Sequence, residues 1–189
     1  CFTLTSADSL NIYKYQNGKF NFLQSGIKQI NSSFYNYILK LKNNNFAFAT
    51  SNGLYIVDRH LKTVLKQFNQ TKGLPNNFIY AVLEDKNENL WITSNKGLSV
   101  ITKTGQIKNF NIDDGLQDLE FNSLSCLKTT DETLVFGGVS GFNFFNPNTF
   151  RFDSTLAKPY FGSIMINDEK EINNKPFINE PLILSYKHN

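Results

Sequence analysis

Few side chains in this sequence could carry out catalysis or bind a metal, and those that could are widely separated. The two histidines are His60 and His188, and the two cysteines are Cys1 and Cys126. A zinc site needs several such ligands at short intervals, and a disulfide framework needs more cysteines than these. We therefore expect no catalytic residue, no metal site and no cofactor, and we expect Cys126 to be a small buried hydrophobic residue.

Three short motifs resemble functional loops without meeting their requirements. Residues 85–89 begin like a calcium-binding D-x-N-x-N loop, but Leu90 stands where that loop needs glycine and Lys96 where it needs glutamate. Residues 137–141 are rich in glycine, yet their spacing fits neither a nucleophile elbow nor a phosphate-binding loop. The acidic pair at residues 113–114 lies in a predicted loop, where we expect it to be solvated. We interpret all three as turns.

Ligand binding through aromatic residues is the other route to function, since these residues make up 14% of the chain. Trp91 could stack on a sugar ring, but it alternates within a predicted strand, and packing between sheets is the better interpretation. A ligand would be expected on loops, where residues 34–37 and residues 76–80 are candidates on composition alone. We assign no ligand-binding residue from the sequence.

A repeating unit must position all of these residues. Ser9, Gly53, Gly97 and Gly141 stand 44 residues apart, and each is followed by leucine or phenylalanine. The flanking sequence keeps the same register, although a one-residue shift would also fit residues 50–52, which leaves the length of that turn open by one. A period in the low forties is typical of propellers, helical arrays and solenoids.

The clearest unit contains four predicted strands, at residues 78–83, 90–93, 98–101 and 107–110. They are short, rich in β-branched and aromatic residues, and joined by polar turns, which predicts an antiparallel meander. The neighbouring units repeat this order, with strands predicted at residues 2–5, 10–15, 20–23, 35–41, 46–49, 54–57, 64–68, 121–127, 134–136 and 142–145. Such a meander cannot bury both faces alone, so we predict an all-β fold of β-propeller blades packed face to face.

The domain prediction follows from where the period stops, after Pro147. We assign residues 1–157 to the C-terminal blades of a larger propeller, and residues 158–189 to the truncated start of a separate immunoglobulin-like β-sandwich domain. The predicted units cover residues 1–33, which lack a first strand, 34–77, 78–119 and 120–157. Because part of a ring leaves sheet faces open, we expect the isolated chain to be poorly soluble or to associate.

Charge and hydropathy argue against two further classes of protein. The net charge is +3, and only Arg59 and Arg151 among 19 basic residues are arginine, without the basic cluster of a nucleic-acid surface. No apolar run approaches the roughly 20 residues of a membrane helix. The sequence opens at Cys1 in mid-strand, without methionine or a visible signal peptide, so we expect its natural N-terminus to lie upstream.

A family resemblance rests on residues 73–98. They begin with Gly-Leu and an Asn-rich loop, continue through a strand with an acidic turn and a strand containing Trp91, and close with Gly-Leu. This order resembles the two-component regulator propeller repeat. Residues 115–147 resemble the last repeat of such sensors, and the tail from Tyr160 to Tyr186 is similar to the start of the triple-tyrosine immunoglobulin-like domain that follows the propeller.

The resemblance implies the periplasmic sensor region of a hybrid histidine kinase of Bacteroidetes type, anchored in the inner membrane. Members of that family pair two propellers and act as homodimers, and many detect oligosaccharides and regulate transcription through a phosphorelay. This chain would be a non-catalytic part, because neither His60 nor His188 lies in a helical phosphoacceptor context. Its partners would be an oligosaccharide, the remaining blades and the immunoglobulin-like domain, without nucleic acid.

Two alternatives stay open at this point. The chain could belong to a scaffold or protein-interaction propeller without a small-molecule ligand, which a downstream membrane helix and kinase would argue against. It could also come from an enzymatic propeller such as a lyase or a quinoprotein dehydrogenase. Those enzymes need acids, histidines or metal ligands around the axis, and this sequence has no such cluster.

Overall fold

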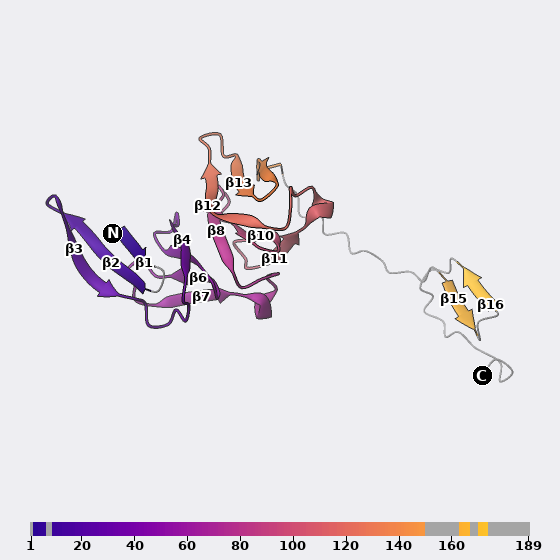
Figure 1. The fold of residues 1–189 in the computed structure, drawn as a ribbon, viewed down its shortest axis with the longest axis horizontal. Coiled ribbons are helices and arrows are strands. Elements are labelled where there is room, and N and C mark those ends of the chain that lie inside the picture. The colour runs from indigo at the N-terminus through magenta and orange to yellow at the C-terminus, as the bar shows by residue number, and fades with distance from the viewer. Residues whose placement is uncertain (1, 7–8, 150–162, 167–169, 174–189) are drawn as a thin grey trace. The chain divides into compact units, whose positions relative to one another are not determined.

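The computed structural model describes residues 2–6, 9–149, 163–166 and 170–173. The chain divides into two compact units, residues 1–150 and residues 151–189, and each is described by itself. In the second unit, β15 (Ser163–Ile166) and β16 (Lys170–Asn173) pair antiparallel (Figure 1). Most of the predicted immunoglobulin-like segment, residues 158–189, lies outside the described residues, so its assignment stays a prediction.

The first unit consists of four antiparallel sheets, each a meander in chain order, which we call blades 1 to 4. Their strands are β1 (Phe2–Ser6), β2 (Ser9–Gln16) and β3 (Lys19–Ser25); β4 (Tyr35–Lys40), β5 (Phe46–Thr50), β6 (Gly53–Val57) and β7 (Val64–Phe68); β8 (Ile79–Glu84), β9 (Leu90–Ser94), β10 (Gly97–Ile101) and β11 (Ile107–Phe110); and β12 (Phe121–Lys128), β13 (Leu134–Gly138) and β14 (Gly141–Phe145). Two short 3-10 helices, η1 (Gln70–Lys72) and η2 (Ile112–Asp114), precede blades 3 and 4. The predicted all-β propeller architecture is confirmed.

The repeat frame holds at the hairpins between the second and third strands of blades 2, 3 and 4. Thr50 pairs with Gly53, Ser94 with Gly97, and Gly138 with Gly141, so each turn has two residues and the shifted frame is excluded. Gly53 and Gly97 have positive φ angles of 104° and 98°. A Cβ atom at either position would lie 2.3 Å from a carbonyl oxygen of the fourth strand, so glycine is required for both reasons.

Three hydrophobic cores fill the spaces between successive blades. The first joins blades 1 and 2, the second joins blades 2 and 3, and the third joins blades 3 and 4. Their buried members are Leu10, Ile12, Ile27, Ile30, Phe48, Tyr55, Val57 and Leu61 in the first; Leu41, Ala47, Ala49, Leu54, Ile56, Leu74, Ile79, Val82, Leu90, Ile92 and Ile101 in the second; and Leu83, Trp91, Leu98, Val100, Phe110, Phe121, Leu134 and Phe136 in the third. Packing between blades therefore buries both faces of blades 2 and 3.

The loops that enter blades 3 and 4 are tied to the preceding blade by equivalent hydrogen bonds. The Gly53 amide donates to the Asn77 carbonyl at 2.7 Å, and the Gly97 amide donates to the Leu119 carbonyl at 2.7 Å. Each loop is thus hydrogen-bonded to the central hairpin of the preceding blade. This contact fixes where the first strand of the following blade begins. Within the described part of the chain, no helix has the length and apolar character needed to cross a membrane.

Candidate functional site

The first strands of blades 2, 3 and 4 lie side by side (Figure 1). Each is bulged near its beginning. The pairing register shifts between Tyr35 and Tyr37 in β4 and between Ile79 and Ala81 in β8. In β12 the shift is longer and spans residues 122–125. A bulge leaves its extra residue unpaired and redirects a side chain, and bulges are common beside functional sites.

The bulged residues contact the neighbouring first strand through polar groups. Asn36, the bulged residue of β4, donates from Nδ2 to the Ile79 carbonyl at 2.8 Å. Tyr80, the bulged residue of β8, donates its hydroxyl to the Glu120 carboxylate just before β12. Burial is the main cause that raises the pKa of Tyr80, and the Glu120 charge adds to it. The phenol therefore stays protonated and able to donate.

Tyr37 links the first strands of blades 2 and 4. Its hydroxyl donates to the Cys126 thiol, and burial together with this contact raises the pKa of Tyr37 to about 12. Burial also raises the pKa of Cys126. Cys126 packs against the third core as a small apolar residue, but it is half-buried, so the prediction that it is buried is wrong.

These contacts define a candidate binding site, which we call the bulge cluster: Asn36, Tyr37, Phe78, Tyr80 and Glu120. Phe78 and Tyr80 lie with ring centroids 5.2 Å apart. Four of the five side chains are half-buried, and Glu120 is exposed, so the cluster is accessible. It offers aromatic edges, two phenol groups, one amide and one carboxylate, a set that suits a neutral ligand with many hydroxyl groups.

The two sequence candidates, residues 34–37 and residues 76–80, both contribute to this cluster. Tyr35 and Tyr37 are half-buried, so part of each side chain is accessible to a ligand. The Tyr35 ring, however, packs edge-on against Phe48 at 6.4 Å in the first core, and burial raises its pKa. The sequence missed Glu120 and the long bulge of β12, where Leu124 is 70% exposed with a positive φ of 61°.

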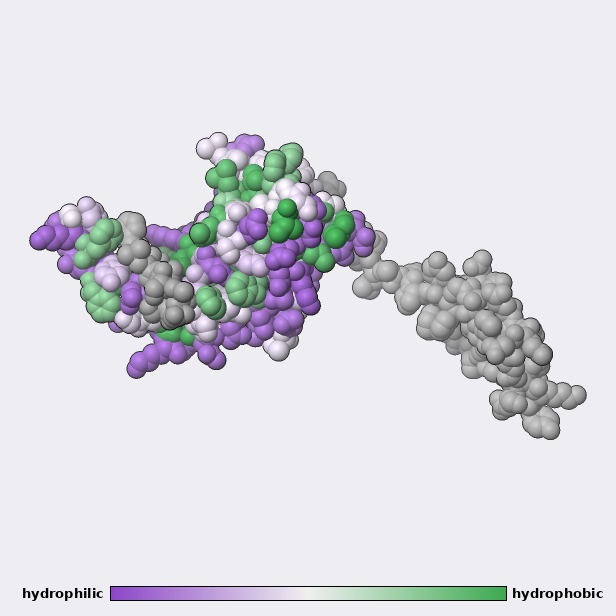
Figure 2. Space-filling model, viewed as in Figure 1, coloured by the Kyte–Doolittle hydropathy of each residue, from purple (hydrophilic) through white to green (hydrophobic). Residues whose placement is uncertain are grey.

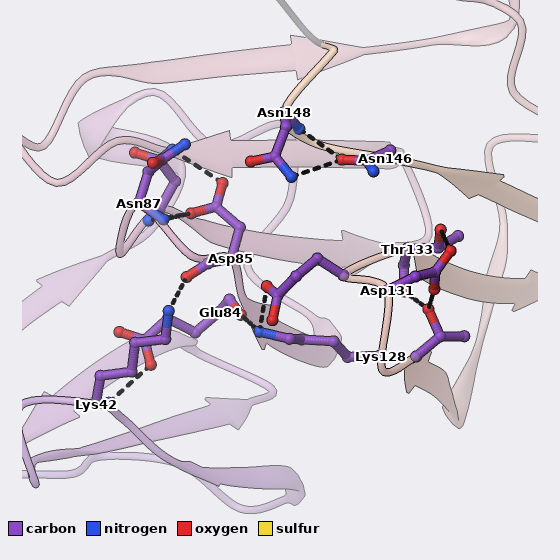
Figure 3. Close-up of polar contacts among 12 residues, drawn as sticks. Lys42, Glu84, Asp85, Asn87, Lys128, Asp131, Thr133, Asn146 and Asn148 are labelled. Atoms are coloured by element: carbon purple, nitrogen blue, oxygen red, sulfur yellow. Dashed lines mark hydrogen bonds and ion pairs between the residues drawn. The ribbon is translucent and has the colours of Figure 1, made fainter.

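The opposite ends of the same strands carry a charged network (Figure 3). The Lys42 amide donates to Glu84 Oε2 at 2.8 Å, and Lys42 Nζ donates to the Asp85 carbonyl at 3.0 Å. From the other side, Lys128 Nζ donates to the Glu84 carbonyl at 3.2 Å and pairs with Glu132 at 2.7 Å. Glu84 is buried, and burial raises its pKa. This network connects blades 2, 3 and 4.

Trp91 packs between blades, as the repeat predicts. It is 2% exposed, stacks on Phe110 at 5.8 Å and contacts Phe145 at 4.7 Å. Its indole Nε1 donates to Asp85 Oδ2 at 3.0 Å, and Asp85 Oδ1 accepts the amide of Asn89 at 2.9 Å. The carboxylate that begins the calcium-like loop is therefore engaged by the turn and by the tryptophan.

The other motifs also have structural positions. The glycine-rich residues 137–141 form the hairpin between β13 and β14. Asp113 and Asp114 lie in η2, where the amide of Asp113 and the side chain of Asp114 complete a capping box with Asn111. His60 lies in a turn, where its amide donates to Asp58 Oδ2, and His188 lies outside the described residues. Among the residues described, no group of three or more histidine, cysteine or acidic side chains could hold a metal.

A groove of about 390 Å³ lies between blades 3 and 4, and none of the bulge cluster lines it. Phe110, Gly115 and Phe145 are among its lining residues. In the preceding interface, Ile107 of β11 fills the corresponding space beside Gly73 and packs on the second core. The groove is thus the position that a fourth strand occupies in blade 3, and we interpret it as structural.

Residues 73–96 match the family described as two component regulator propeller. These residues run from the loop that enters blade 3 to its central hairpin, through Asp85 and Trp91. The resemblance to the two-component regulator propeller repeat is confirmed: blade 3 is built on that repeat.

Comparison with individual proteins agrees with this class. The chain is 38% identical over 80 residues to a histidine kinase of Formosa agariphila, a match that covers 42% of this chain and 6% of the kinase. Two solved extracellular domains from B. thetaiotaomicron are also similar. The first comes from a hybrid two-component system, with a TM-score of 0.64, 23% identity and coverage of 76% of this chain and 21% of that one. The second comes from a one-component system, with a TM-score of 0.64, 19% identity and coverage of 92% and 27%.

The chain therefore spans a small part of each relative, from 6% of the kinase to about a quarter of the solved domains. The likeness to the solved domains establishes the propeller fold. What the whole relatives bind or transmit belongs to those proteins.

Proposed function

We propose that this chain is part of the extracytoplasmic ligand-sensing region of a two-component histidine kinase system, in the periplasm of the cell. The observation that carries the proposal is the match of residues 73–96 to the two-component regulator propeller family. The relative with a stretch of 38% identity is named as a histidine kinase, and similar propeller domains are named as extracellular. The chain contributes binding and conformational signalling, while catalysis resides elsewhere in the parent protein.

The bulge cluster supports a carbohydrate as the ligand. Phenol groups at Tyr37 and Tyr80 and the amide of Asn36 provide directional hydrogen bonds, and Phe78 provides an apolar ring. Glu120 is the single acidic group of the cluster, which favours a neutral ligand over an anion. A sugar presents hydroxyl groups and an apolar ring face together, which matches this set.

The location of the cluster supports signalling by a shift between blades. Asn36, Tyr37 and Tyr80 each contact a different blade from their own, so a ligand that competes for these groups would change contacts between blades. A ligand shifts an equilibrium only if it binds one conformation more tightly than another. Side chains that contact a neighbouring blade would bind the ligand with different affinity in the two conformations.

Calorimetric titration of the complete extracytoplasmic region with a panel of oligosaccharides tests this proposal. We expect one class to bind, and we expect Tyr80→Phe to weaken binding about fivefold, as the loss of one hydrogen bond of about 1 kcal/mol predicts. Lys19→Ala, at the exposed end of the β2–β3 hairpin, should bind like the wild type. Thermal unfolding of each variant separates lost binding from lost folding.

A panel without any binding sugar, together with tight binding of a protein partner, would contradict carbohydrate sensing and favour an interaction propeller. Kinase autophosphorylation in membranes that contain the parent protein gives the second readout. An activating sugar should change the rate, and Tyr80→Phe should require more of the sugar for the same change.

A further inference from the structure

Phe34, an exposed ring in blade 2, occupies the same position in its blade as two members of the bulge cluster. The residue directly before the first strand is Phe34 in blade 2, Phe78 in blade 3 and Glu120 in blade 4. Phe34 is 45% exposed and lies outside the three hydrophobic cores. Figure 2 shows hydrophobic residues among hydrophilic ones over the side of the blades in view, so one exposed ring is not unusual on this surface. The position of Phe34 in the repeat, rather than its exposure, sets it apart.

Neighbouring blades do not bury this position. Phe78 belongs to blade 3, which packs against blade 2 on one side and blade 4 on the other, and its side chain is still only half-buried. The equivalent Glu120 is exposed. Phe34 should therefore stay accessible when further blades of the parent protein complete the ring.

Backbone contacts hold Phe34 in place although its ring is exposed. Its carbonyl accepts the Ser51 amide of the β5–β6 hairpin at 3.1 Å and the Ser32 hydroxyl at 3.0 Å. The Glu120 carbonyl likewise accepts the Val139 amide of the β13–β14 hairpin at 3.2 Å. Both positions are thus anchored to the central hairpin of their own blade. A fixed backbone has less freedom to lose when a ligand covers the side chain, which favours binding.

Blades 2 and 3 each place a ring next to a hydrogen-bonding side chain two residues later. In blade 3, the rings of Phe78 and Tyr80 lie 5.2 Å apart. The equivalent pair in blade 2, 44 residues earlier, is Phe34 and Asn36. Asn36 Nδ2 donates to the Ile79 carbonyl at 2.8 Å, and the amide oxygen keeps its capacity to accept. Because β4 and β8 lie side by side, the two pairs form a row across blades 2 and 3.

We propose that Phe34 and Asn36 form a second subsite next to the bulge cluster, and that the ligand is a linear neutral oligosaccharide with successive sugar units over blades 2 and 3. This inference rests on the carbohydrate ligand proposed above. A sugar ring presents an apolar face that can stack on Phe34 and hydroxyl groups that can bond to Asn36. Glu120 replaces the aromatic ring in blade 4, so the stacking row ends at blade 3 and hydrogen bonds hold the ligand beyond it.

Affinity as a function of ligand length tests the second subsite. The complete extracytoplasmic region is titrated calorimetrically with the monosaccharide, disaccharide, trisaccharide and tetrasaccharide of linear glucose, mannose, xylose and galactose series. In the series that binds, we expect the affinity to rise about tenfold with the unit that reaches Phe34, the scale of covering a half-exposed phenylalanine. Phe34→Ala should remove this rise and leave the affinity of the shorter members unchanged.

Further variants separate the role of the ring from an effect on folding. Phe34→Tyr keeps the ring and should keep the rise in affinity, whereas Phe34→Leu is apolar without a ring and should lose most of it. This comparison tests the subsite even if Phe34→Ala folds poorly, which thermal unfolding detects. Leu65→Ala, at a 50% exposed site on the opposite edge of blade 2, should bind every member like the wild type.

The length dependence also distinguishes failure of the subsite from failure of the proposed function. Equal affinity of the wild type for all lengths, or a Phe34→Ala variant that weakens every length equally, would overturn the second subsite and leave carbohydrate sensing intact. Tyr80→Phe, by contrast, should weaken every length, because its hydroxyl belongs to the bulge cluster that all members fill. A panel in which no sugar binds would contradict the proposed function, and the second subsite with it.

Discussion

At the scale of single residues, Trp91 contributes to stability in two ways, by packing and by a hydrogen bond. Its ring fills the third core between Phe110 and Phe145, and its indole N–H satisfies the buried carboxylate of Asp85. The second contribution explains why a tryptophan follows an acidic turn in this blade. A phenylalanine could provide the packing without the hydrogen bond.

We expect Trp91→Phe to lower the free energy of unfolding by about 1–3 kcal/mol, because Asp85 loses a donor while remaining 1% exposed. Circular dichroism during denaturant unfolding measures the change without relying on tryptophan fluorescence. Val139→Ala, at an exposed hairpin position, should change stability by less than about 0.5 kcal/mol. Equal effects for the two substitutions would show that the indole hydrogen bond contributes nothing.

Glu84 gives a prediction about pH. Burial raises its folded pKa above the ordinary value of 4.5. A raised folded pKa means that the stabilisation is complete below the unfolded pKa and is lost as the pH rises through the folded pKa. We therefore expect Glu84→Gln to gain stability relative to the wild type as the pH increases from about 4 toward neutrality. Denaturant midpoints at several pH values measure this, and a difference independent of pH would contradict it.

At the scale of the elements, the hairpin glycines are equivalent in sequence and differ in their surroundings. Gly97 and Gly141 both have positive φ angles, of 98° and 126°. A Cβ atom on Gly97 would lie 2.3 Å from the Phe110 carbonyl oxygen, whereas one on Gly141 would have no atom of the described residues within 4 Å. The fourth strand of blade 3 thus adds a steric requirement to the conformational one.

We expect Gly141→Ala to cost about 1–2 kcal/mol of stability from backbone strain alone, and Gly97→Ala to cost about 3 kcal/mol or more. Chemical denaturation of both variants compares the two costs at matched positions of the repeat. Similar losses would indicate that β11 moves aside without cost, and would remove the steric part of the explanation.

At the scale of the whole molecule, stability should follow how many faces of a blade are covered. Blades 2 and 3 have cores on both sides, whereas blades 1 and 4 each contribute to one core among the described residues. Regions with fewer buried contacts open with a smaller free energy.

Hydrogen exchange of the dilute isolated chain should show this order. We expect the slowest amide exchange in β5, β6, β9 and β10, and faster exchange in β2, β3, β13 and β14. Peptide-resolved mass spectrometry measures the rates. Uniform protection across all four blades would indicate that the unit unfolds only as a whole.

Much of the fold could be predicted because a blade is a local structure. The glycines at positions 53, 97 and 141 mark two-residue hairpins, and short strands on either side pair with their neighbours in sequence. The repeat also predicted that Trp91 packs between blades, where it is buried. The bulges were not predictable, because a register shift inside a strand depends on the strand beside it.

The sequence by itself determined the repeating unit, the strands and the hairpins, since these depend on side-chain alternation and on turn residues within about 40 positions. Only the tertiary structure decided which side chains meet where the first strands of blades 2, 3 and 4 lie side by side. Asn36 reaches Ile79, Tyr37 reaches Cys126, and Lys128 reaches Glu84, each across a gap of more than 40 residues. Such contacts depend on how one blade packs against the next, because hydrophobic packing between faces fixes the relative position of strands that never pair.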